Sequence, residues 1–144
     1  MSEKDIEKVI LFQIEKTGKT AKQYSQKAFD KINLGITVDQ WVLLKIIHEA
    51  NVLSQKELAK KSLRDPASIT RTLDILEKKN LIYREAIPNN RRKYNIILSP
   101  EGTVFVNKHM SLIDSQREKS VSGFSNKELE LLSNMLLRIQ KNMS

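Results

Sequence analysis

The chain has 144 residues, a length that suits one compact domain. It contains no cysteine, which excludes a disulfide framework, a thiolate metal site and a thiol redox switch. The net charge of +8 favours an anionic partner. The positive charge is concentrated, because residues 54–98 hold 11 of the 25 Lys and Arg residues but only 5 of the 17 Asp and Glu residues.

No apolar run approaches the roughly 18 residues of a membrane helix. The first eight residues are charged and lack the apolar stretch of a secretory signal. These features predict a cytoplasmic protein with no membrane partner.

Residues 5–32 are predicted to form one long helix. Apolar residues such as Ile6, Ile10 and Ile14 recur mostly at three- and four-residue steps. A helix of this length would span about 42 Å, which exceeds the width of a small domain. It therefore favours pairing with a second chain, although packing within one chain is the alternative.

Two short sequence signals predict the next helices. Thr37 with Gln40, and Ser54 with Glu57, have the spacing of a capping box. The first box begins a helix over residues 38–50. The second begins a short helix that ends near residue 62.

Asp65 and Pro66 predict the start of a further helix over residues 66–79, because an N-cap carboxylate is followed by proline at the first helical position. Asn80 would end this helix in a left-handed conformation. Only three residues separate the two helices, which is the spacing of a helix-turn-helix.

The helix over residues 66–79 is amphipathic. Ile69, Leu73 and Leu76 fall on one stripe. The residues opposite or flanking that stripe are Ala67, Ser68, Thr70, Arg71, Asp74 and Lys78. This small, hydroxylic and cationic face suits a DNA major groove, while an ordinary solvated face is the alternative.

A β-hairpin follows, with strands predicted over residues 81–87 and 93–98 joined by Pro88-Asn89-Asn90-Arg91-Arg92, in which Pro88-Asn89-Asn90 favours a turn. Arg91, Arg92 and Lys93 come directly after that turn. A charged hairpin behind a helix-turn-helix is typical of a wing that contacts phosphates or the minor groove. A solvated hairpin without a partner is the alternative.

Two more helices complete the chain. Ser99 and Pro100 begin one that reaches about residue 119, and a third Ser-x-x-Glu box, Ser125 with Glu128, begins one that reaches about residue 141. The last helix carries the seam pattern of paired helices at Leu129, Leu132, Leu136, Ile139 and Met143.

Three stretches together resemble the MarR-type (multiple antibiotic resistance regulator) winged helix-turn-helix family. They are "LGITVDQWVLLKII", "LSQKELAKKSLRDPASITRTLDILEKKNLIYR" and "NNRRKYNIILSPEG". The resemblance implies a mainly α fold with a small β-hairpin wing and a homodimer. It assigns residues 5–32 and 101–141 to dimerisation helices, residues 38–98 to a DNA-binding lobe, residues 66–79 to the recognition helix and residues 84–98 to the wing.

The chain departs from the family pattern at two positions. Asn90 replaces the aspartate that precedes the wing arginine in the family, so an ion pair cannot order that loop. Ser99 replaces the usual threonine three residues before Gly102, which is a conservative change.

No catalytic or cofactor motif is present. His48 and His109 are the only histidines, and the chain has no HExxH, GxSxG or glycine-rich phosphate loop. The sequence therefore predicts neither an enzyme nor a bound cofactor or metal. The resemblance implies a small aromatic effector, for which Trp41, Tyr24 and Phe12 are candidates, or else ordinary core aromatics. No ligand-binding residue is assigned.

The sequence thus predicts a dimeric, ligand-responsive repressor that binds a pseudo-palindromic double-stranded DNA site. The alternatives are a sequence-indifferent architectural DNA-binding protein and an interaction module that does not bind DNA. The predicted DNA-binding residues are Ser54, Lys56, Arg64, Pro66, Ala67, Ser68, Thr70, Arg71, Lys78, Arg84, Asn90, Arg91, Arg92 and Lys93.

We expect Arg92→Ala to weaken DNA binding and to make the slope of log K against log[salt] shallower by about one unit, because one phosphate contact is lost. A salt titration of duplex affinity measures both quantities. Unchanged affinity and slope would remove Arg92 from the interface.

Overall fold

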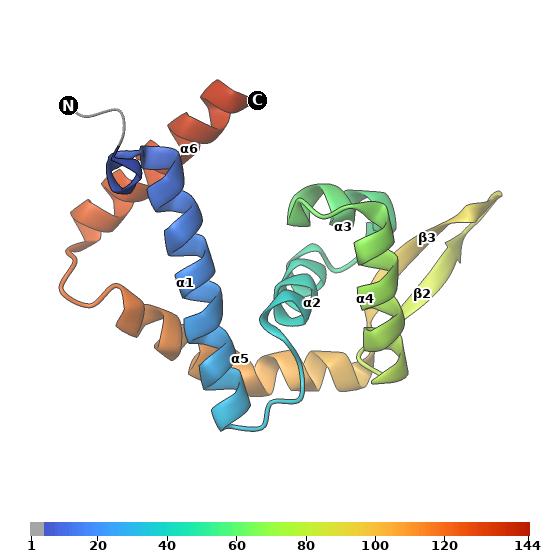
Figure 1. The fold of residues 1–144 in the computed structure, drawn as a ribbon. Helices are drawn as coiled ribbons and strands as arrows, with labels where there is room; N and C mark the ends of the chain where they lie inside the picture. The colour runs from blue at the N-terminus through green and yellow to red at the C-terminus, as the bar shows by residue number, and fades with distance from the viewer. Residues whose placement is uncertain (1–4) are drawn as a thin grey trace. The chain divides into compact units, whose positions relative to one another are not determined.

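A computed structural model describes residues 5–144, except for the side chains of Arg91 and Arg92. The elements are a 3₁₀ turn η1 (Ile6–Lys8), α1 (Ile10–Lys31), α2 (Val38–Ala50), β1 (Leu53–Ser54), α3 (Gln55–Ser62), α4 (Pro66–Lys78), β2 (Ile82–Ile87), β3 (Asn90–Leu98), α5 (Pro100–Ser120) and α6 (Asn126–Met143) (Figure 1). The predicted fold class, mainly α with a small β wing, is confirmed. The chain divides into two compact units, Met1–Ser111 and Leu112–Ser144, which are described separately.

Local capping signals placed most helix starts correctly. Thr37, Ser54 and Ser125 each form the predicted capping box at the starts of α2, α3 and α6. Asp65 caps α4 by accepting the backbone N–H of Ser68 at 2.9 Å. None of the helices within residues 5–144 is long and apolar enough to cross a membrane.

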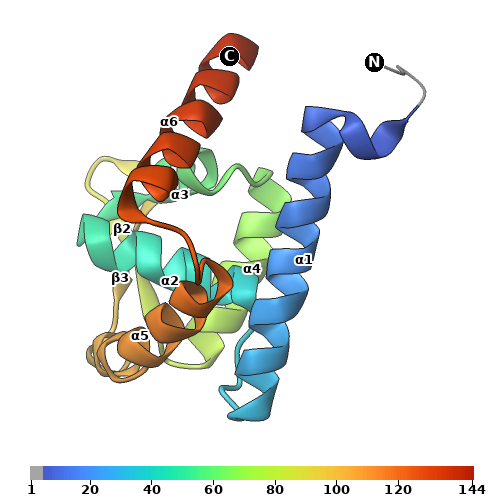
Figure 2. The same ribbon diagram turned by 90° about the vertical axis from the view of Figure 1, so that its left-hand side faces the viewer.

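The first helix differs from the prediction at its start. Asp5 caps the three-residue turn η1 by accepting the backbone N–H of Glu7, and Val9 then adopts an extended backbone with φ −76° and ψ 120°. Figures 1 and 2 show η1 set across the end of α1. The prediction of one helix over residues 5–32 is therefore wrong, because the extended backbone at Val9 separates the capped turn from α1. The remaining 22 residues of α1 span about 33 Å.

The sheet has three antiparallel strands in the order β1-β3-β2. The sequence predicted only the hairpin, since the two residues of β1 are too few to show an alternating pattern. Leu53 of β1 lies opposite Ile96 of β3, which joins the wing to the residues that precede α3.

The turn of the hairpin is shorter than predicted. Only Pro88 and Asn89 connect the strands, and Asn89 has the left-handed φ of 67° that asparagine tolerates. Ala86 lies opposite Tyr94, whereas Ile87 lies opposite Asn90, so residues 91–93 form a bulge in β3. The three cationic residues therefore belong to this bulge.

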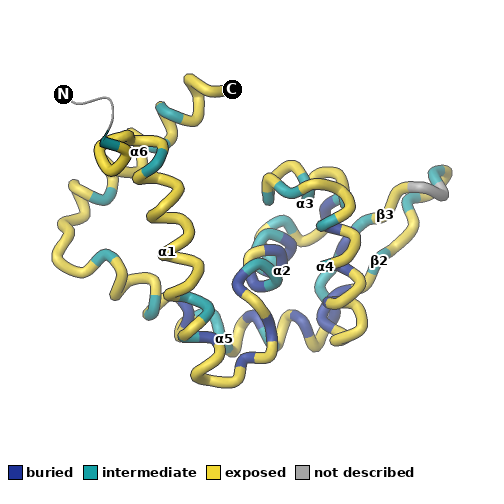
Figure 3. Tube along the Cα trace, viewed as in Figure 1, coloured by how far each residue is buried: buried dark blue, intermediate teal, exposed yellow. Residues whose placement is uncertain are grey.

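The core of the first unit lies between α2 and the inner faces of α4 and β3 (Figure 3). Ile69, Leu73 and Leu76 are fully buried, which confirms the predicted inner stripe of α4. Their fully buried neighbours from other elements are Trp41, Leu43, Leu44, Ile47, Leu58, Ile96 and Val106. The opposite face of α4 is thereby turned toward solvent.

A polar junction joins the end of α4, the end of β3 and the start of α5. Ser99 is buried, its Oγ donates to the Asn80 carbonyl and accepts from the Gly102 N–H at 2.9 Å, and its own N–H donates to the Leu81 carbonyl at 3.0 Å. Asn80 has a φ of 60°, as predicted for the residue that ends the recognition helix. A Cβ atom on Gly102 would stand 1.9 Å from the Leu81 carbonyl oxygen.

Gly102→Ala is therefore expected to lower the free energy of unfolding by roughly 3 kcal/mol, because a backbone carbonyl cannot move aside as a flexible side chain can. Urea unfolding at a fixed protein concentration measures this change. Gly18→Ala in α1 is the matched control: nothing lies within 4 Å of its added Cβ, so alanine should stabilise the protein by up to about 1 kcal/mol. Equal stability of the two variants would contradict the close approach at Gly102.

Candidate nucleic-acid interface

The helix-turn-helix is formed by α3 and α4 with a three-residue turn between them. Leu63 reverses the chain in the left-handed conformation at φ 56°, and its side chain is 93% exposed. The Arg64 N–H closes the turn on the Ala59 carbonyl at 3.1 Å. Asp65 and Pro66 then begin α4 as predicted.

The outer face of α4 presents most of the residues that were predicted for it. Those exposed to solvent are Pro66, Ala67, Thr70, Arg71 and Lys78. Ser68 is half-buried, so its hydroxyl belongs to the edge of this face. The exposed surface therefore carries fewer hydroxyl groups than the sequence suggested.

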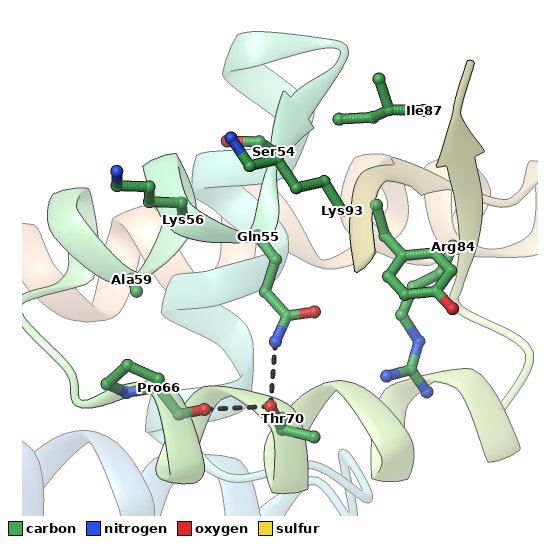
Figure 4. A pocket seen from close by; sticks show the side chains of 10 residues that line it. Ser54, Gln55, Lys56, Ala59, Pro66, Thr70, Arg84, Ile87 and Lys93 are labelled. Atoms are coloured by element: carbon green, nitrogen blue, oxygen red, sulfur yellow. Dashed lines mark hydrogen bonds between the residues drawn. The ribbon is translucent and has the colours of Figure 1, made fainter. Parts of the chain in front are cut away.

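A groove of about 590 Å³ lies between the start of α3, the first half of α4 and the wing (Figure 4). It brings together six predicted residues: Ser54, Lys56, Pro66, Thr70, Arg84 and Lys93. Sequence analysis missed four others that line it: Gln55, Ala59, Ile87 and Tyr94. Gln55 and Tyr94 directly follow the predicted Ser54 and Lys93 in the chain, but only the fold shows that they face one space.

The other predicted residues lie outside the lining of this groove. They are Arg64 in the turn before α4, Ala67, Ser68, Arg71 and Lys78 on α4, and Asn90 at the start of β3. The side chains of Arg91 and Arg92 lie outside the described residues.

Thr70 is fixed by two hydrogen bonds at the floor of the groove. Its Oγ1 donates to the Pro66 carbonyl at 3.0 Å and accepts from Gln55 Nε2 at 2.9 Å (Figure 4). The contact joins the first residue of α3 to the second turn of α4. The hydroxyl of Thr70 is therefore engaged within the protein.

Arg84 connects β2 of the wing to α4. Its guanidinium forms ion pairs with Asp74 and with Glu77, where Nε lies 3.2 Å from the carboxylate oxygen. The hydrogen bond to Glu77, followed by that to Asp74, raises the pKa of Arg84 above its ordinary value. The side chain is only 20% exposed, so Arg84 holds β2 against α4 and its charge is largely compensated inside the protein.

Arg64 is also engaged within the protein. Its Nη2 lies 3.2 Å from Asp39 Oδ2, and the same oxygen lies 2.8 Å from Nζ of Lys22 on α1. One carboxylate of α2 thus ties the helix-turn-helix to α1. Asp39 therefore compensates the charges of both Arg64 and Lys22.

Among the predicted DNA-binding cations whose side chains the structure describes, four form no ion pair with a carboxylate: Lys56, Arg71, Lys78 and Lys93. They come from α3, α4 and β3, which line the groove together with Ser54 of β1 and with Arg84 and Ile87 of β2. Uncompensated cations on a concave surface attract a polyanion.

No group of three or more His, Asp or Glu side chains that could hold a metal ion occurs among residues 5–144. The rings of His109 and Phe105 are in contact, with centroids 4.6 Å apart and planes tilted by 56°. Burial, followed by the charge of Lys108, lowers the pKa of His109. Trp41 is fully buried between Phe29 and Phe105.

Comparisons with known proteins agree with this architecture. The model of the MarR family matches residues 36–94. The structure of the Staphylococcus aureus MepR–DNA complex is 25% identical and has a TM-score of 0.80, covering 94% of this chain and 98% of that one. A mutant Escherichia coli MarR complexed with operator DNA is 21% identical, with a TM-score of 0.82 and coverage of 96% and 99%.

A third similar structure concerns the regulation of DNA binding of Bordetella bronchiseptica BpsR by 6-hydroxynicotinic acid. It is 16% identical, covers 92% of this chain and 94% of that one, and has a TM-score of 0.82. At this identity the likeness shows the fold alone.

We expect Arg84→Gln and Glu77→Gln to be energetically coupled by about 0.5–1 kcal/mol in a double-mutant cycle of urea unfolding, because the Arg84 side chain is mostly buried beside a half-exposed Glu77. The pair Glu15 and Lys19, with both side chains at least 68% exposed, is the matched control and should couple more weakly. Additive effects of the two Arg84 and Glu77 substitutions would contradict the positioning role.

Proposed function

We propose that the chain is a member of the MarR family, which its sequence match and its fold both support, and that it is a ligand-responsive repressor that binds a pseudo-palindromic DNA site as a homodimer. The family is one of DNA-binding transcriptional regulators rather than enzymes. A regulator of this kind acts on DNA in the cytoplasm, which is the location that we propose.

The observation that carries the proposal is the exposed outer face of α4 next to a groove with unpaired cations. An α-helix fits the major groove of B-DNA, and one sugar-phosphate strand separates that groove from the adjacent minor groove. With α4 in the major groove and the wing at the minor groove, the intervening strand would pass between them. Lys56 and Lys93, which line the groove there, supply charge for its phosphates.

The proposed contacts divide into two groups. Ala67, Ser68, Thr70 and Arg71 would meet base edges and nearby phosphates, because they occupy the first two turns of α4. Lys56, Lys78 and Lys93, together with Arg91 and Arg92, would supply the salt-dependent term. Arg64 and Arg84 would act mainly by holding α4 and the wing in place, since both already have carboxylate partners.

The dimer is proposed from the apolar surface of the terminal helices. In α1, Ile10 and Leu11 are each 55% exposed. In α6 none of the 18 residues is buried, and Leu132 and Met143 of the predicted seam are 43% and 61% exposed. Such stripes gain free energy when a second chain covers them. Residues 5–32 and 101–141 are the proposed dimerisation segments, and residues 38–98 the proposed DNA-binding lobe.

A small aromatic effector is proposed by analogy with BpsR, whose DNA binding is regulated by 6-hydroxynicotinic acid. Of the three aromatic candidates, Trp41 is a core residue in this conformation, while Tyr24 is 38% exposed and Phe12 is half-buried. No residue is assigned to the effector.

The proposal is tested by selecting bound duplexes from a random pool and then competing the winner against random DNA. We expect a two-fold-related pair of half-sites about one helical turn apart, and a random competitor that is weaker by at least about 10³-fold at physiological salt. Equal competition by random duplex would instead identify a sequence-indifferent architectural binder. Absence of salt-dependent duplex binding would identify an interaction module.

A further inference from the structure

The hydrogen bonds of Thr70 determine which of its groups can contact a base. A threonine side chain offers one O–H donor, an acceptor oxygen and one methyl group. The single proton is used toward the Pro66 carbonyl, because that carbonyl can only accept. The oxygen must then accept from Gln55, which fixes the amide of Gln55 with its nitrogen toward Thr70. The hydroxyl has no proton left for a base or a phosphate.

The methyl group is the apolar part of Thr70 and has no partner among these contacts, while the hydroxyl keeps one acceptor lone pair. Figure 4 shows it pointing away from Pro66, toward the side of the groove where Arg84 lies. The two hydrogen bonds hold the side chain in one rotamer, so the methyl position is fixed before any partner arrives. Ala67, one turn earlier on the same helix, is exposed and also ends in a methyl group.

We propose that Thr70 determines DNA sequence specificity through its methyl group, by contacting the C5-methyl of a thymine in the major groove of each half-site. Thymine is the one base that presents a methyl group there, and threonine methyl groups are among its apolar partners. The proposal rests on the proposed function, since it requires α4 to enter the major groove. It replaces the expectation that Thr70 reads a base through its hydroxyl.

The experiment uses the full-length dimer and the duplex that it selects from a random pool. Each thymine of a half-site is replaced in turn by deoxyuridine, which removes only the C5-methyl group. At one thymine we expect the wild-type protein to lose about fourfold in affinity per half-site, the effect of one buried methyl group. The affinities of two variants for the thymine and deoxyuridine duplexes are then compared at that position. Each variant is first checked for folding by its thermal melting curve.

The two variants separate the methyl from the hydroxyl. Thr70→Ser keeps both hydrogen bonds and deletes the methyl, so it should bind the thymine and deoxyuridine duplexes equally. Thr70→Val keeps the methyl and deletes the hydroxyl, so it should still prefer thymine. Preference for thymine retained by Thr70→Ser, or a half-site in which no thymine responds to deoxyuridine, would overturn the inference. If the wild-type protein enriches no sequence at all, the proposed function itself fails, which is a separate result.

Discussion

The geometry of the interface depends on the buried junction between Ser99, Gly102 and the Asn80–Leu81 backbone. At this point the chain leaves α4, returns from the wing and enters α5, so three elements share one set of hydrogen bonds. The absence of a Cβ at Gly102 lets α5 lie directly against the Leu81 carbonyl. A larger residue would force these elements apart, and the relation of the wing to α4 would change with them.

A second constraint is electrostatic, and it divides the basic residues into two groups with different tasks. Arg84 and Arg64 are half-buried and paired with carboxylates, so they maintain shape. Lys56, Arg71, Lys78 and Lys93 have no such partner in the described residues and remain available to a polyanion. Net charge alone does not distinguish the two groups, because each residue of either group counts as one positive charge toward the total of +8.

Sequence reasoning succeeded where the determining forces are local. The capping boxes, Asp65-Pro66 and the left-handed Asn80 each depend on residues within one turn, and each was placed correctly. It failed where distant segments decide. The strand at Leu53 exists only because Ile96 lies beside it, and the carboxylate partners of Arg84 and the hydroxyl partners of Thr70 come from other turns or elements. The break at Val9 is local, but the apolar periodicity of the surrounding residues continues across it, so the prediction missed it.

The bulge at residues 91–93 lies between the paired strands at the base of the wing and the turn at its end. The register of the paired strands therefore does not depend on the length of that end. Below it, pairs such as Arg84 with Ile96 and Ile82 with Leu98 are set by the sheet and the core. Beyond it, a single pair, Ile87 with Asn90, closes the hairpin. Insertions or deletions inside the bulge can therefore be absorbed without shifting the lower strands by one residue, a shift that would exchange their inner and outer faces. The wing can vary its reach along a nucleic acid while the scaffold beneath it keeps its alignment.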